Sequence, residues 1–166
     1  IKKLNSETDV LKKVKSQSSF SGSMRVNLIK MLDELELNKK LNLPTCEDLF
    51  SIDSELLHST SVLRYPVFKD NKNYTGSSPS PIKSEFLWNM IEKMLVPELN
   101  NFENKLIIPL GKNVNDVLVK LKAENKIKSN LILEGFPHPS GANGHRATQF
   151  NLNKIAMKKD IEKWVY

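Results

Sequence analysis

The sequence predicts an α/β fold of three layers (α/β/α), in which helices cover both faces of a mainly parallel central sheet. Two observations lead to this class. Short apolar runs suited to buried strands alternate with longer segments whose apolar residues recur every three or four positions. Each of the two clearest strand candidates, 106–110 and 131–133, is followed by a glycine-containing turn and then by such a segment. Alternating strands and helices favour a parallel sheet.

The first half of the chain contains one clear helix and one predicted strand. Residues 1–19 have only a weak helical pattern and are the least defined part, a possible helical lead-in. Gly22 and Ser23 precede a helix whose inward residues are Met24, Leu28, Met31, Leu32 and Leu35. We expect a strand over 56–68, which is rich in β-branched and aliphatic residues and leads into a polar loop over 69–80.

The second half contains three helices and two strands. Apolar pairs repeat every four residues in a helix that Pro97 is expected to end; they are Phe86/Leu87, Met90/Ile91 and Met94/Leu95. The strand 106–110 turns at Gly111 into a helix with Val114, Val117, Leu118 and Leu121 facing inward. After the strand 131–133, a last helix runs from about 147 to 165, with Leu152, Ile155, Trp164 and Val165 as its apolar contacts.

Length and composition are those of one globular domain spanning residues 1–166, since 39% of the 166 residues are hydrophobic. No run approaches the roughly 20 apolar residues that cross a bilayer, and the start lacks a signal peptide. We therefore expect an intracellular, cytoplasmic protein without membrane contact. Cys46 is the only cysteine, which excludes an intrachain disulfide, and the three scattered histidines predict no metal site.

The net charge is positive. The chain has 25 Lys and Arg against 19 Asp and Glu, which gives +6. Such an excess favours a polyanionic partner if it collects on one face, although many proteins without such a partner are equally basic.

Polar segments follow the predicted strands at their carboxyl ends, where ligands of open α/β sheets bind. These segments are 59–76, the turn at Gly111 and Lys112, and the loop 136–146. We expect them to converge on one cleft.

The loop 136–146 places His138 between two prolines and continues through Ser140 and two glycines to Arg146. Prolines restrict the backbone, and glycines allow another backbone to come close. Such a loop would hold His138 in one pose and offer Ser140, backbone amides and Arg146 to a phosphate, helped by the N-terminus of the next helix. The alternative is a rigid surface loop with solvated histidines.

The segment His138-Pro139-Ser140 resembles the His-Pro-Ser motif of the uracil-DNA glycosylase superfamily. Segments 19–24, 61–81 and 106–118 resemble further segments of that family in the same order and spacing. The match covers roughly residues 18–160 and falls between the bacterial iron–sulfur branch and the single-strand-selective branch. Only the His-Pro-Ser segment is specific by itself.

This resemblance implies a glycosylase-like domain that hydrolyses the N-glycosidic bond of uracil or a related damaged base in DNA, as in base excision repair. The partner would be single- or double-stranded DNA, and the protein would be a monomer in the cytoplasm, associated with the bacterial nucleoid. No cofactor would be needed. His138 would hydrogen-bond the base oxygen as the bond breaks, and Phe20 would stack on the extruded base. The base-reading position would fall to Ser59, Thr60 or Ser61. The DNA contacts would come from Lys112, Ser140, Gly141, Asn143 and Arg146.

The sequence departs from the family pattern in three places. The first motif, which positions the hydrolytic water, has no counterpart in residues 1–19, so the chain is either a fragment or lacks that residue. A hydroxyl of Ser59, Thr60 or Ser61 stands where the family usually has the uracil-reading Asn, and a hydroxyl cannot match the paired donor and acceptor of an amide. Cys46 alone cannot hold an iron–sulfur cluster.

Two other functions therefore stay open. One is a catalytically silent protein of this fold that binds nucleic acid or another protein. The other is an unrelated α/β domain that binds a nucleotide or phosphate at the Gly111 and His138 loops, for which the sequence lacks a glycine-rich fingerprint.

Overall fold

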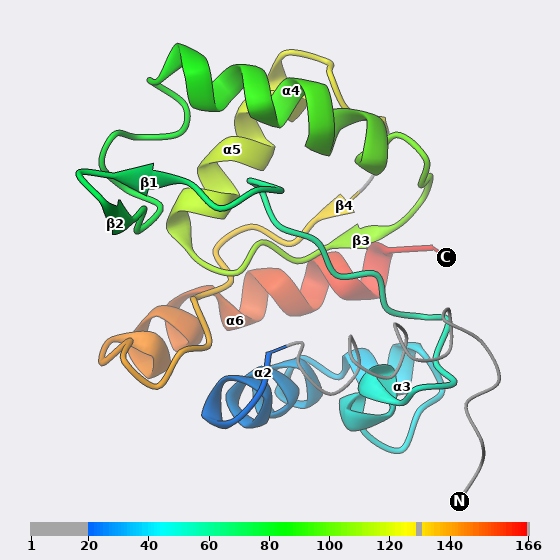
Figure 1. Ribbon diagram of the computed structural model, residues 1–166. Coiled ribbons are helices and arrows are strands. Elements are labelled where there is room, and N and C mark those ends of the chain that lie inside the picture. Colours follow the sequence, from blue (N-terminus) through cyan, green and yellow to red (C-terminus); the bar gives the residue numbers. More distant parts are fainter. Residues whose placement is uncertain (1–19, 129–130, 166) are drawn as a thin grey trace, which may run out of the picture. The chain divides into compact units, whose positions relative to one another are not determined.

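The computed structural model describes residues 20–128 and 131–165 (Figure 1). The lead-in expected over 1–19 lies outside this part of the chain. Contacts divide the chain into two compact units. Unit 1 holds the described residues up to Ser59 together with Pro139–Gly144; unit 2 holds Thr60–His138 and the described residues from His145 onward. Among the described helices, none combines the length and the apolar character needed to cross a bilayer.

Unit 1 is built on helix α2 (Ser23–Glu34), followed by the short helix α3 (Leu37–Lys40) and the 3-10 helix η1 (Cys46–Phe50). The predicted start at Gly22 and Ser23 is confirmed. So is the inward stripe, because Leu28, Met31, Leu32 and Leu35 are all buried. Asp33 connects α2 to η1: its carboxylate accepts hydrogen bonds from the Thr45 hydroxyl and the Cys46 N–H, both at 2.7 Å.

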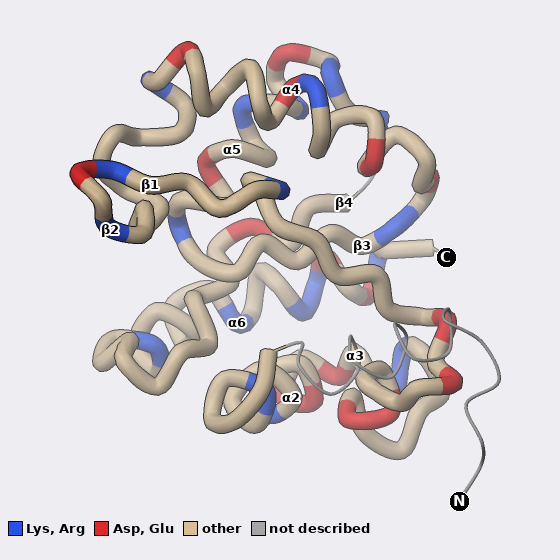
Figure 2. The backbone as a smooth tube through the Cα atoms, viewed as in Figure 1, with Lys and Arg blue, Asp and Glu red and all other residues tan. Residues whose placement is uncertain are grey.

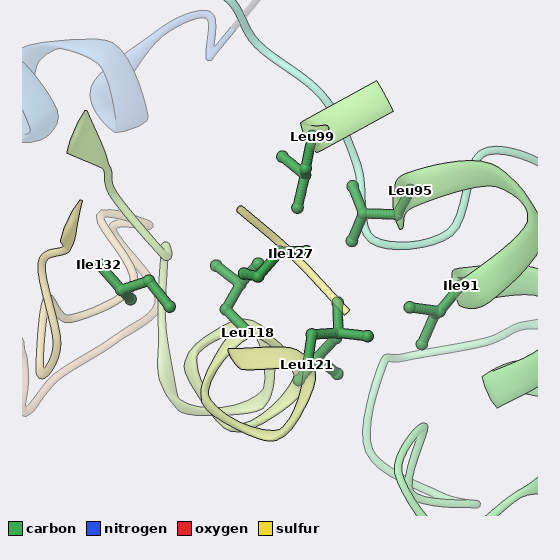
Figure 3. Packing of buried hydrophobic residues seen from close by; sticks show 8 residues of the cluster. Ile91, Leu95, Leu99, Leu118, Leu121, Ile127 and Ile132 are labelled. Carbon is green, nitrogen blue, oxygen red and sulfur yellow. The ribbon is translucent and has the colours of Figure 1, made fainter. Parts of the chain in front are cut away.

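Unit 2 has its core between α4 (Glu85–Leu99) and α5 (Lys112–Ala123). Figure 3 shows α4 side chains facing those of α5. The buried cluster consists of Ile91, Leu95, Leu99, Val117, Leu118, Leu121, Ile127 and Ile132. The four-residue repeat predicted for α4 is confirmed, but only the second residue of each pair is buried, and Phe86 is 69% exposed.

The parallel strand pair of unit 2 carries the site. Strand β3 (Leu106–Ile107) pairs in parallel with β4 (Leu131–Ile132), and α5 is the crossover between them (Figure 1). The predicted order of strand, glycine turn, helix and strand is therefore confirmed here. An antiparallel hairpin, β1 (Phe68–Lys69) with β2 (Lys72–Asn73), precedes α4. Asp70 and Asn71 form its two-residue turn, and both have positive φ, as type I′ hairpin turns require.

The prediction of a three-layer fold around a central parallel sheet is wrong. In the described part of the chain each strand has two residues, and the strands form one parallel and one antiparallel pair, so helices supply most of the regular structure. Of the strand expected over 56–68, residues 56–67 are irregular and only Phe68 belongs to a strand, β1, although Val62 and Leu63 still pack on the core of unit 2. Pro109 lacks an N–H group, which prevents β3 from continuing the ladder.

Two helix predictions also need correction. Pro97 lies inside α4, which continues to Leu99; a proline two residues from the end removes only one backbone hydrogen bond. Helix α6 (Arg146–Lys163) occupies the predicted range, but its inward residues are Phe150, Met157 and Ile161. Leu152, Ile155 and Val165 are exposed, contrary to prediction.

The inward side of α6 includes a polar residue, which explains the error. The Asn153 amide donates to the Gly135 carbonyl at 3.0 Å, and the Phe150 ring meets the Phe136 ring edge-on, with ring centroids 6.3 Å apart. Because apolar spacing alone cannot identify an inward asparagine, the predicted face of α6 was rotated away from the true one. Trp164 is half-buried as expected, and its indole N–H donates to the Asn104 carbonyl at 3.0 Å.

Candidate functional site

His138 is presented by a rigid segment that follows β4. Pro137 and Pro139 are both buried, whereas His138 between them is exposed. Since each proline restricts its own φ and the conformation of the residue before it, the backbone on both sides of the histidine has little freedom. The imidazole thus stands at the surface on a backbone of restricted conformation.

The Gly111 turn lies directly against His138. The Gly111 N–H donates to the Phe136 carbonyl at 3.1 Å, and a Cβ added to Gly111 would lie 3.0 Å from the His138 Cβ. Gly111 has φ +96°, which L side chains rarely adopt. Both segments follow carboxyl ends of the parallel strands, so this part of the predicted convergence is confirmed.

The start of α5 completes this arrangement in unit 2. Gly111 is its N-cap and provides no side-chain cap, and the first turn, all of it described, contains no Asp or Glu. The Asn113 amide donates to the Gly76 carbonyl at 2.9 Å, which brings in the loop after the β1–β2 hairpin. The positive end of the α5 dipole therefore lies beside the exposed imidazole.

The candidate base-reading residues fall in both units. Ser59 is half-buried in unit 1, whereas Thr60 and Ser61 are exposed in unit 2. The Thr60 hydroxyl donates to the Glu98 carboxylate at 2.9 Å, and Glu98 also pairs with Arg64 at 2.7 Å. Thr60 is thus engaged with α4.

The Ser140 turn belongs to unit 1 and lies against the start of α2. The Ser140 hydroxyl accepts from the Ala142 N–H, and its carbonyl accepts from the Asn143 N–H, both at 3.1 Å. The Asn27 amide donates to the Pro139 carbonyl at 2.9 Å, and a Cβ at Gly141 would lie 3.2 Å from the Ser23 hydroxyl. The Ser140 turn, which was predicted to contact DNA, therefore meets the start of α2 in unit 1.

Phe20 is half-buried, and its ring packs edge-on against Phe50, with centroids 6.2 Å apart. Its predicted role in base stacking stays a prediction. The two predicted cationic contacts lie in unit 2. Arg146 begins α6 and is half-buried, and exposed Lys112 pairs with Asp116 at 2.5 Å.

A groove of about 700 Å³ in unit 2 was missed by the sequence reasoning. It lies between the segment 62–76, which includes the β1–β2 hairpin, and the first turn of α5. Tyr65, Phe68 and Tyr74 line it, together with Asn113. Its signal in the sequence was the pair of aromatic residues Tyr65 and Phe68, in a segment whose true conformation the strand prediction obscured.

Cys46 is not a candidate nucleophile. It is buried, and burial raises the pKa of its thiol far above the ordinary value, assisted by the neighbouring Asp33 carboxylate. A thiol that stays protonated reacts poorly. Within the described ranges, no group of three or more His, Cys, Asp or Glu side chains is arranged to hold a metal ion.

Comparison with known proteins finds one informative similarity. No family model matches the chain, and no solved structure matches it. The chain is similar to the uncharacterized protein YoxB of Bacillus subtilis (strain 168), with 41% identity over 151 residues, which is 90% of this chain. The matched region spans 59% of that relative's length. The similarity therefore covers most of this chain and assigns no activity.

Proposed function

We propose that this protein binds DNA and hydrolyses the N-glycosidic bond of uracil or a related damaged base. The observation that carries the proposal is the exposed imidazole of His138, held between two buried prolines and against Gly111 at the start of α5. An imidazole N–H on this restricted backbone would stand beside the positive end of a helix dipole. Such a pair suits an oxygen that becomes negative during a reaction.

Base excision produces that kind of charge. When the bond between C1′ and the base nitrogen breaks, its electron pair passes into the base, and negative charge grows on the base carbonyl oxygen. An N–H of His138 would hydrogen-bond this oxygen, and the α5 dipole would add to the stabilisation. Water then forms the new C1′–O bond and loses a proton, which neutralises the departing base.

The Ser140 turn would hold the DNA backbone. Its hydroxyl would donate to a phosphate oxygen, and the turn lies against the start of α2, whose first turn, fully described, contains no acidic residue. A phosphate is well placed at such a helix end. Lys112 would exchange Asp116 for a second phosphate, since its side chain is 82% exposed and a surface ion pair of this kind contributes only about 1 kcal/mol or less.

Excision assays with the full-length protein test this proposal. Single- and double-stranded oligonucleotides carrying uracil, hypoxanthine or xanthine are incubated with the protein and scored for alkali-labile breaks. We expect His138→Ala to lower the rate roughly 100- to 1,000-fold, the effect of removing one donor to a developing oxyanion. His145→Ala is the matched control, because His145 is an exposed histidine of the same loop. Breaks that persist at the wild-type rate in His138→Ala would refute the assignment.

A second candidate is a protein that binds DNA without cutting the base out. The engagement of the Thr60 hydroxyl with Glu98 favours it, because this hydroxyl stands at the expected base-reading position. DNA binding that weakens steeply with salt, without breaks on any of these substrates, would support this candidate. Absence of DNA binding would count against both.

A further inference from the structure

The aromatic groove of unit 2 has the size of a ligand site. Its volume of about 700 Å³ lies within the usual range for pockets that hold small molecules. One wall is tied to the start of α5 by the hydrogen bond from the Asn113 amide to the Gly76 carbonyl. The Tyr74 hydroxyl donates to the Pro79 carbonyl at 2.5 Å, which connects the groove-lining residue Tyr74 to the loop that follows the β1–β2 hairpin. The groove is thus bounded by mutually bonded segments.

Exposed aromatic rings distinguish this groove from an ordinary surface hollow. Tyr65 is 61% exposed and Phe68 is 64% exposed. Phe68 lies opposite Asn73 in the hairpin register, so the ring and the amide project from the same face of the hairpin, and both line the groove. A ring next to an amide suits a nucleobase, which stacks on the ring and offers hydrogen-bonding groups at its edge.

The charge around the groove favours a polyanion. Residues 60–83 contain four cations and one acidic residue; they are Arg64, Lys69, Lys72 and Lys83 against Asp70, and Arg64 pairs with Glu98. Figure 2 shows cationic positions on both strands of the hairpin. Among the described residues that line the groove, none is Asp or Glu. An anionic strand could therefore approach without meeting a carboxylate in the groove itself.

We propose that this groove binds unpaired bases of a single DNA strand beside the target nucleotide. The inference rests on the proposed function and adds to it a preference for single-stranded substrate. Asn113 in the groove wall is two residues from Gly111, which contacts His138, so a strand in the groove lies next to the proposed base contact. Stacking on Tyr65 and Phe68 requires bases that are not paired, which disfavours duplex DNA.

Binding of undamaged DNA tests the groove separately from excision. Fluorescence anisotropy measures the affinity of the full-length protein for labelled oligothymidine of about 16 nucleotides, the upper end of the usual site size. We expect Tyr65→Ala and Phe68→Ala each to weaken binding about tenfold, a typical loss for one stacked base. Tyr65→Phe keeps the ring and should retain affinity. Phe86→Ala is the matched control, because Phe86 is 69% exposed on α4 and does not line the groove.

The outcomes separate the two proposals. Wild-type excision that depends on His138, together with unchanged oligothymidine affinity in Tyr65→Ala and Phe68→Ala, overturns the groove and leaves the glycosylase proposal standing. Ring-dependent binding without excision supports the groove and overturns the glycosylase proposal. Equal affinity for duplex and single strands, or binding of a proline-rich peptide in place of DNA, overturns the groove. Far-UV circular dichroism establishes that each variant is folded.

Discussion

Replacing Gly111 with alanine tests the contact on which the proposed function depends. Gly111 has φ +96° and ψ 167°, a region of backbone conformation that is almost restricted to glycine. The added Cβ would also lie 3.0 Å from the His138 Cβ, closer than nearly all real contacts of this kind. The substitution therefore strains the backbone of the turn and also creates a steric clash with the proposed catalytic histidine.

The magnitude follows from these two effects. Holding a non-glycine residue in such a conformation costs roughly 1–3 kcal/mol. Overpacking adds a cost of about 1 kcal/mol or more, because the neighbour is the Cβ of His138, and its backbone is restricted by two buried prolines. We expect Gly111→Ala to lower the free energy of unfolding by about 2–4 kcal/mol.

Alanine substitutions at two other glycines separate the effect of backbone strain from the effect of the steric clash. Gly22 has φ +68° with no atom within 4 Å of the added Cβ, so Gly22→Ala reports backbone strain without a clash. Gly144 has no neighbour within 4 Å and no positive φ, so Gly144→Ala should change stability by about 0.5 kcal/mol or less. Urea denaturation followed by circular dichroism measures all three. Equal stability of Gly111→Ala and Gly144→Ala would refute the geometry assigned to the turn.

Two further predictions concern stability. Leu121 is fully buried in the core of unit 2, so Leu121→Ala should lower the free energy of unfolding by about 2–5 kcal/mol. Leu152 on α6 is 79% exposed, so Leu152→Ala should lower it by about 0.5 kcal/mol or less. Similar losses of stability in the two variants would contradict the assigned buried side of α6. Burial acts to raise the pKa of Asp33, but hydrogen bonds from the Thr45 hydroxyl and Cys46 outweigh it and lower the pKa. A carboxyl whose pKa is lower in the folded state than in the unfolded state (about 3.9) stabilises the fold above the unfolded-state pKa, and this stabilisation is lost as the pH falls through the folded-state pKa. Asp33→Asn should therefore be less stable than wild type near neutral pH, and the difference in unfolding free energy should shrink below about pH 4. A difference that stays constant with pH in urea titrations would rule out this role for the carboxylate.

The helices were predictable from the sequence because their signals are local. The three- and four-residue spacing of Leu28, Met31, Leu32 and Leu35 fixes the inward side of α2 without reference to any other segment. The same holds for Val117, Leu118 and Leu121 in α5. Gly111 between β3 and α5 was recognisable as a turn because glycine there follows an apolar run and precedes a periodic one.

The strands and the details of the candidate site depend on contacts between distant residues. A strand exists only where a partner supplies hydrogen bonds, and no pattern within 56–67 reveals that these residues lack a ladder. Likewise, the inward Asn153 is explained by Gly135, and the engaged Thr60 by Glu98, which is 38 residues away. Phe68 and Asn113 line the same groove although they are 45 residues apart in the sequence.

By itself, the sequence determined approximately where α2, α4, α5 and α6 lie, that a glycine turn connects β3 to α5, and that His138 stands between two conformationally restricting prolines. These features depend on residues that are neighbours along the chain. Only the tertiary structure decided how short the strands are, which side of α6 is buried, how closely His138 lies against Gly111, and that Tyr65 and Phe68 border a groove. Those features depend on which residues from distant parts of the sequence come into contact, and the spacing of side chains within one segment does not reveal which other segment it will contact.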